Sequence, residues 1–248
     1  MKTRQEKRIK EQQKLSKEKR EFKIALIIVI VIVAILVSTM FLPDLIKEWK
    51  YKASLVKLTA TESYLLDENG NKYYTLNRSV EAVNTDGVFG LLDGKEFCFI
   101  DFMHTDGVLP SYIVEHKNGI KGSVLRLESA SDITLSDFMP VSADICAKDS
   151  EYPYDYFVAP DEYLSNGGSN RNDEEYINLI YDTLTKGEEV NPPKQQVSSL
   201  RVKLKSQKYP GLYYSIAFST DENGISYLCD IGSGKYVLSP DKLTVRLS

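Results

Sequence analysis

The sequence predicts a single N-terminal transmembrane helix followed by an extracytoplasmic α+β domain, which is mainly antiparallel β with one clear amphipathic helix at about 173–186. Three observations lead to this fold class. A long uncharged run lies near the N-terminus, Asn-Gly and Asp-Gly turn signals punctuate the rest of the chain, and one apolar stripe has helical spacing. The boundaries that follow are 1–23 for a basic cytosolic tail, 24–42 for a transmembrane signal-anchor helix, 43–52 for an interfacial collar and 53–248 for the outer domain.

Length and composition suit a folded chain with room for a hydrophobic core. The 248 residues are 42% hydrophobic and 27% charged, and the net charge of −4 hides a strong asymmetry. Residues 1–23 contain ten Lys or Arg and four Asp or Glu, whereas the remainder contains 21 basic and 31 acidic residues. Because the outer region has this acidic excess, nucleic acid is not expected as a partner.

The uncharged run extends from Ile24 to Leu42 and contains only two polar residues, Ser38 and Thr39. At about 1.5 Å per residue it is roughly 28 Å long, which matches the hydrocarbon core of a bilayer. Its length and the bulky residues before Pro43 favour an uncleaved signal-anchor over a cleaved signal peptide. Basic residues crowd its N-terminal flank, so the positive-inside rule predicts a cytosolic N-terminus and an extracytoplasmic domain at the cell membrane.

Three residues at the two ends of this run have the chemistry of a membrane interface. Lys23 precedes the run, and Trp49 and Tyr51 follow it. Basic and aromatic side chains of this kind reach the headgroup level of a membrane. The lipid bilayer is therefore an expected partner.

Beyond Ala53, short runs of β-branched and aromatic residues alternate with turn dipeptides. The motif Asp-Glu-Asn-Gly occurs twice, at 67–70 and at 221–224, and a Tyr follows three residues after each Gly. We interpret this repetition as shared hairpin chemistry and not as a duplicated domain. The strands predicted by the pattern are 55–66, 72–76, 95–103, 112–116, 121–128, 200–206, 212–219, 225–229 and 235–238.

One segment of the outer region has helical periodicity. Asn172 is expected to cap this helix, and Gly187 is expected to end it in a left-handed conformation. The apolar stripe, which is expected to lie on a sheet, consists of Tyr176, Ile177, Ile180, Tyr181 and Leu184. An acidic, aromatic connector, 149–170, precedes the helix, so the outer region is either one composite domain or two subdomains at 53–148 and 171–248.

The same connector is the candidate partner-binding segment. Pro153 and Pro160 argue against a regular element there, so its aromatic rings must either pack on the domain or face a partner. Tyr is enriched at binding hot spots, and the acidic neighbours would select a basic protein surface. The candidate residues are Tyr152, Tyr154, Tyr156, Phe157 and Tyr163.

The two histidines, His104 and His116, do not form a shared metal site in this interpretation. If 95–103 pairs with 112–116, a rise of about 3.4 Å per residue separates the imidazoles by more than about 10 Å, too far for one ion. We therefore expect no metal, no other cofactor and no catalytic residue that the sequence alone would reveal.

The cysteines and one glycine-rich segment suggest no further chemistry. Cys98 and Cys229 lie in strand-like, apolar surroundings, which is typical of buried thiols, and the three Cys of the chain allow at most one disulfide. Residues 232–235, Gly-Ser-Gly-Lys, resemble the end of a phosphate loop. They lack the earlier Gly and the following Ser or Thr, so we interpret them as a hairpin turn.

These observations predict a membrane-anchored, non-catalytic binding or assembly module of the cell envelope, with a possible protein partner. Two alternatives stay open. An envelope hydrolase or transpeptidase could assemble its site only in three dimensions, because catalytic triads are recognised by geometry and not by order. A regulator could instead couple an outer signal to a membrane partner.

Overall fold

The structure is a computed structural model that describes residues 23, 26–27, 29–31, 46–47, 50–117, 120–158 and 173–248. The chain divides into two compact units, Met1–Leu55 and Val56–Ser248. In the first unit, the described residues up to Ser54 are helical. The second unit is mainly β-structure.

The predicted transmembrane helix is wrong for the part of the chain that the structure describes. No helix among those residues is long and apolar enough to cross a membrane. Within 24–42, Val29–Val31 are described and helical. The other residues of that range, apart from Leu26 and Ile27, lie outside the described residues.

The three predicted interface residues are only partly described. Lys23 is exposed and helical, and Tyr51 is helical with half of its side chain exposed. Trp49 lies outside the described residues. Their contact with a bilayer stays a prediction.

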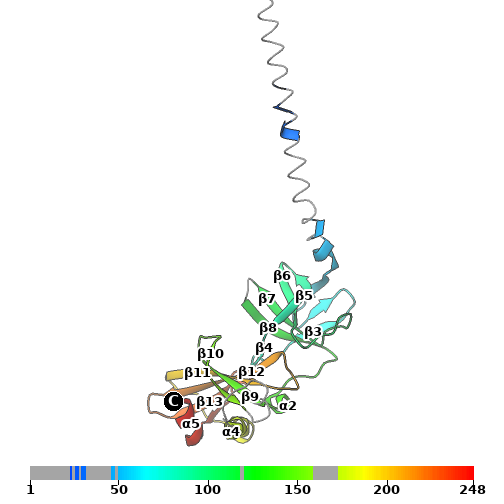
Figure 1. The fold of residues 1–248 in the computed structure, drawn as a ribbon. Coiled ribbons are helices and arrows are strands. Elements are labelled where there is room, and N and C mark those ends of the chain that lie inside the picture. The colour runs from blue at the N-terminus through cyan, green and yellow to red at the C-terminus, as the bar shows by residue number, and fades with distance from the viewer. Residues whose placement is uncertain are drawn as a thin grey trace, which may run out of the picture. The chain divides into compact units, whose positions relative to one another are not determined.

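The second unit contains a closed seven-stranded barrel (Figure 1). Neighbouring strands run antiparallel around it except β1 and β5, which pair in parallel and close the barrel. In spatial order the strands are β1 (Val56–Ala60), β2 (Leu65–Asp67), β3 (Lys72–Thr75), β8 (Ile120–Leu127), β7 (Tyr112–Lys117), β6 (Lys95–Ile100) and β5 (Thr85–Leu92).

The barrel strands contribute to two separate cores. Phe97 and Ile113 belong to a core inside the barrel, whereas their neighbours Cys98 and Val114 belong to a larger core outside it. Successive side chains of a strand point to opposite faces, which explains this division. The interior core consists of Leu58, Tyr73, Phe89, Phe97, Ile113 and Leu125.

A second, open sheet follows the barrel along the chain. One of its strands, β4 (Val80–Ala82), comes from the segment between β3 and β5 and pairs with β12. The other strands, in spatial order, are β10 (Pro153–Val158), β9 (Ser142–Ala147), β11 (Gln196–Lys205), β12 (Leu212–Asp221), β13 (Ser226–Asp230) and β14 (Tyr236–Leu238). The strand β4 therefore ties the barrel segment of the chain into the second sheet.

Helices α2 (Leu135–Phe138), α4 (Glu174–Lys186) and α5 (Asp241–Leu247) contribute to the larger core. The amphipathic helix of the sequence is α4, and it buries Ile177, Ile180 and Leu184 as predicted. Its ends differ from the prediction. Asp173 is the N-cap residue, Asn172 lies outside the described residues, and Gly187 is extended, with φ −66°, instead of left-handed.

The predicted fold class needs correction in its β portion as well. The structure has a closed barrel and a second sheet, where the sequence pattern suggested an α+β domain. The predicted strand 55–66 is interrupted after Ala60, where β1 ends. The backbone N–H and the hydroxyl of the next residue, Thr61, both donate to the carbonyl oxygen of Tyr64 and form a turn. The strands β4, β5, β9 and β10 were not predicted, and β9 and β10 extend the second sheet.

The two Asp-Glu-Asn-Gly turns do share one hydrogen-bond pattern, as predicted. The carboxylate of Asp67 accepts from the backbone N–H groups of Asn69 and Asn71 at 2.9 and 2.7 Å. The carboxylate of Asp221 accepts from the corresponding groups of Asn223 and Ile225, both at 2.9 Å. One turn belongs to the barrel and the other to the second sheet, so the motif encodes a local shape and not a domain.

Candidate functional site

The predicted partner-binding residues lie mainly on β10, the edge strand of the second sheet. Tyr152, just before the strand, is 85% exposed, and Tyr154 and Tyr156 are 62% and 50% exposed. Phe157 is fully buried and stacks on Tyr176 of α4, with ring centroids 5.3 Å apart. Tyr163 lies outside the described residues. We call Tyr152, Tyr154 and Tyr156 the tyrosine row, since they recur at every second residue.

The sequence interpretation that Pro153 excludes a regular element is wrong. Pro153 is the first residue of β10 and pairs with Cys146 of β9, with an irregularity before Asp155. Proline is compatible with the first position of an edge strand because no ladder hydrogen bond from its nitrogen is needed there.

Carboxylates accept hydrogen bonds from backbone N–H groups of β10. The side chain of Asp155 accepts from the N–H of Tyr156 at 2.8 Å, and the side chain of Asp173 accepts from the N–H of Val158 at 3.4 Å. Arg246 of α5 donates to the other oxygen of Asp155 at 2.6 Å. Capped donors of this kind protect an edge strand from pairing with another strand.

A charge network lies beside the tyrosine row. The ammonium group of Lys203 on β11 is buried and donates to Glu151 at 2.7 Å, while the Glu151 side chain is 75% exposed. The hydrogen bond from Lys203 lowers the pKa of Glu151 below its ordinary value. Lys205, also on β11, pairs with Asp144 of the adjacent strand β9 at 2.8 Å.

The barrel has a cavity of about 320 Å³ at one end. The connection between β1 and β2 forms its rim, and Phe97 and Leu125 form part of its apolar wall. Three charged residues line it, and two of these, Lys95 of β6 and Glu115 of the adjacent strand β7, pair with each other at 2.7 Å. The third, Glu62, lies in the connection between β1 and β2 and gives the lining a net negative charge.

The two histidines lie in different surroundings. His104 stacks on Phe99, with ring centroids 4.5 Å apart, and its Nε2 atom lies 3.4 Å from a carboxylate oxygen of Asp86. His116 is on β7, directly opposite Glu96 of β6. The predicted pairing of these two strands is therefore confirmed.

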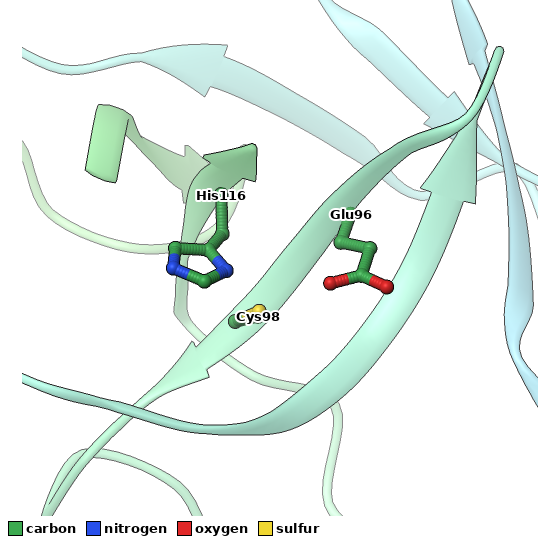
Figure 2. A group of neighbouring side chains, drawn as sticks. All are labelled: Glu96, Cys98 and His116. Carbon is green, nitrogen blue, oxygen red and sulfur yellow. The ribbon is translucent and has the colours of Figure 1, made fainter. Parts of the chain in front are cut away.

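His116 belongs to a group that the sequence interpretation did not recognise. One ligand atom each from Glu96, Cys98 and His116 lies within 4.8 Å of the other two (Figure 2). Glu96 is exposed, His116 is half-buried and Cys98 is buried. Burial, and to a smaller degree the Glu96 carboxylate, raises the pKa of the Cys98 thiol. We call these three residues the ligand triad.

The remaining predictions on the cysteines and the glycine-rich segment are confirmed. Cys98, Cys146 and Cys229 are free and buried. The segment 232–235 forms the turn between β13 and β14. In that turn, the N–H of Gly232 donates to the Ser79 hydroxyl at 2.8 Å, and Ser79 bonds to Asp230.

Comparison of the chain with protein-family models, with curated proteins and with solved structures found no match. Its function must therefore be argued from the residues themselves.

The sequence contained a usable signal for the ligand triad. Glu96 and Cys98 are two residues apart in a predicted strand, so they share one face. The sequence does not reveal the register of the two strands, and His116 joins Glu96 and Cys98 only because it lies opposite Glu96.

Proposed function

We propose that the second unit is a non-catalytic protein-binding module whose contact surface is the tyrosine row. The supporting observation is the exposure of these three side chains, between 50% and 85%, next to the fully buried Phe157. Large rings gathered at one edge of the sheet provide apolar area that a partner can cover. Tyrosine gives such contact at a small cost in side-chain entropy.

The contact is made by side chains and not by addition of a strand. Asp155 and Asp173 already accept hydrogen bonds from N–H groups of β10. A peptide that extended the sheet would have to displace these carboxylates, which weakens the case for β-augmentation. The rings of Tyr152 and Tyr154 need no such displacement, because they are exposed.

The chemistry around the row favours a basic protein surface as partner. Asp149 is exposed, and the Glu151 side chain is 75% exposed although it pairs with Lys203. Complementary charge of this kind increases the association rate and selects against acidic partners. Binding should therefore weaken as salt concentration rises.

Protein binding by the second unit does not depend on a membrane anchor. The extracytoplasmic location of this unit and a cytosolic N-terminus of the chain stay predictions from the sequence. The same holds for the two alternatives, an envelope hydrolase or transpeptidase and a regulator of a membrane partner.

The proposal can be tested by site-specific photo-crosslinking in cells that express the chain. An aromatic photo-crosslinking residue replaces Tyr154 in one variant and Phe102 in the control, because Phe102 is an aromatic residue with 76% exposure outside the row. We expect one defined partner to crosslink at 154, to be lost when Tyr152→Ala is added, and to weaken at high salt. Equal crosslinking from both positions would contradict the proposal.

A further inference from the structure

We propose that the ligand triad, Glu96, Cys98 and His116, binds a divalent transition-metal ion, for which Zn²⁺ is the best-suited candidate. This site is separate from the tyrosine row and does not depend on the proposed binding function. It replaces the expectation of no metal, which rested only on the separation of the two histidines. A carboxylate and a thiol lie beside His116 and supply the other two ligands.

The register of two strands brings the triad together. Glu96 and Cys98 are separated by one residue on β6, so their side chains point to the same face. His116 of β7 is directly opposite Glu96, and Val114 is opposite Cys98. The imidazole is therefore a direct neighbour of one ligand and a diagonal neighbour of the other, distances that side chains on adjacent strands can bridge.

The distances leave only a small adjustment for coordination. The ligand atoms are within 4.8 Å of one another. Bonds of about 2.0–2.3 Å in a tetrahedral site place ligand atoms roughly 3.3–3.8 Å apart. We expect rotation of the exposed Glu96 carboxylate and of the half-buried imidazole to supply the difference. Figure 2 shows the Cys98 sulfur between these two groups.

The donor set identifies the class of ion. A thiolate and an imidazole are ligands for zinc and related transition metals, whereas magnesium and calcium prefer oxygen ligands alone. With the thiol deprotonated, the two negative charges of Glu96 and Cys98 balance a divalent cation. Three protein ligands leave a fourth position for water or an external ligand.

A neighbouring cation, Lys121, is bound elsewhere. Lys121 is opposite His116 on β8, but its ammonium group donates to the carbonyl oxygens of Ala82 and Val83. Cys98 is 4% exposed and fixed in the larger core, which holds the sulfur in place. The exposed Glu96 leaves a route for the ion from solvent.

The test measures zinc binding to the purified full chain by equilibrium dialysis, with Co²⁺ absorption as a second readout. Cobalt bound to a thiolate gives a charge-transfer band, which reports directly on Cys98. We expect one ion per chain. Glu96→Gln and His116→Gln should each weaken binding about 100-fold or more, because the loss of a mere supporting residue already costs 10–100-fold. Cys98→Ser should remove the charge-transfer band.

The chain supplies matched controls. His104→Gln removes the other histidine, and Cys229→Ser removes another buried thiol. Both should bind one ion with unchanged affinity. If Cys98→Ser fails to fold, Glu96→Gln decides the matter, since Glu96 is exposed and its replacement leaves the core intact. Absence of stoichiometric binding by the natural chain, or equal losses in the controls and in the triad variants, would overturn the proposal.

Discussion

The barrel and the second sheet deal with strand edges in different ways. The barrel removes its edges by pairing β1 with β5, where Val56 faces Gly90. A side chain at position 90 would place its Cβ atom 2.7 Å from the carbonyl oxygen of Val56, so this contact requires glycine. The second sheet keeps an open edge at β10 and protects it with the carboxylates of Asp155 and Asp173.

This difference has consequences for binding. A closed barrel fixes the register of every strand, which is what a group of ligands on two adjacent strands needs. An open edge leaves side chains of one strand exposed, which suits contact with a partner. The predictions that follow test how independent the two regions are.

The largest effects are expected in the two cores. Ile113→Ala in the barrel and Ile180→Ala in α4 remove side chains that are fully buried. Each should lower the free energy of unfolding by about 2–5 kcal/mol. Because Val114 of the barrel belongs to the larger core, both variants should shift one common transition in denaturant melts followed by circular dichroism. Two separate transitions would show that the barrel and the sheet unfold independently.

A smaller loss, about 1–3 kcal/mol for overpacking, is expected when a methyl group is added at a close contact. Gly90→Ala collides with backbone at the barrel closure, whereas Gly232→Ala collides with the side chain of Asn77. Adding Asn77→Ala should therefore recover part of the stability lost by Gly232→Ala. No recovery in thermal melts would mean that the turn itself, and not the Asn77 contact, excludes a side chain.

The turn of the second sheet should make stability depend on acid. Burial raises the pKa of Asp221, but the N–H groups of Ile225 and Asn223 lower it further, and the net pKa is below its ordinary value. The ionised form thus stabilises the fold above the unfolded pKa of about 3.9, and this contribution is lost as pH falls through the lower folded value. In urea melts, the stability difference between the natural chain and Asp221→Asn should stay constant above about pH 5 and shrink below about pH 4. A constant difference down to pH 2 would contradict the carboxylate's role.

Local signals in the sequence were sufficient for part of the fold. The two Asp-Glu-Asn-Gly turns and α4 are encoded by neighbouring residues, and the structure confirms both. The short strand β4 and the strand β10, which begins with Pro153, carry no comparable local pattern. Their pairing is decided by distant strands, so a single sequence does not reveal it.

The same reasoning explains the outcome for the candidate sites. The sequence reveals that aromatic residues are concentrated in this segment. Only the folded sheet shows that Phe157 is buried while Tyr154 is exposed. The ligand triad depends on a register of β6 and β7, and a shift of one residue would move His116 to the other face. Hydropathy predicted a membrane helix, and the described residues do not contain one.

The smallest stability effect should come from the tyrosine row itself. Tyr152 and Tyr154 are 85% and 62% exposed, so their joint replacement by Ala should change the free energy of unfolding by no more than about 0.5 kcal/mol, as for most surface substitutions. Phe157→Ala on the same strand should cost about 3–5 kcal/mol, because its ring is fully buried against Tyr176. Denaturant melts of both variants measure this contrast. Retained stability of the double variant, together with loss of the crosslink from position 154 when Tyr152→Ala is added, would show that the rings serve a partner. A large loss of stability would show that they hold the sheet together.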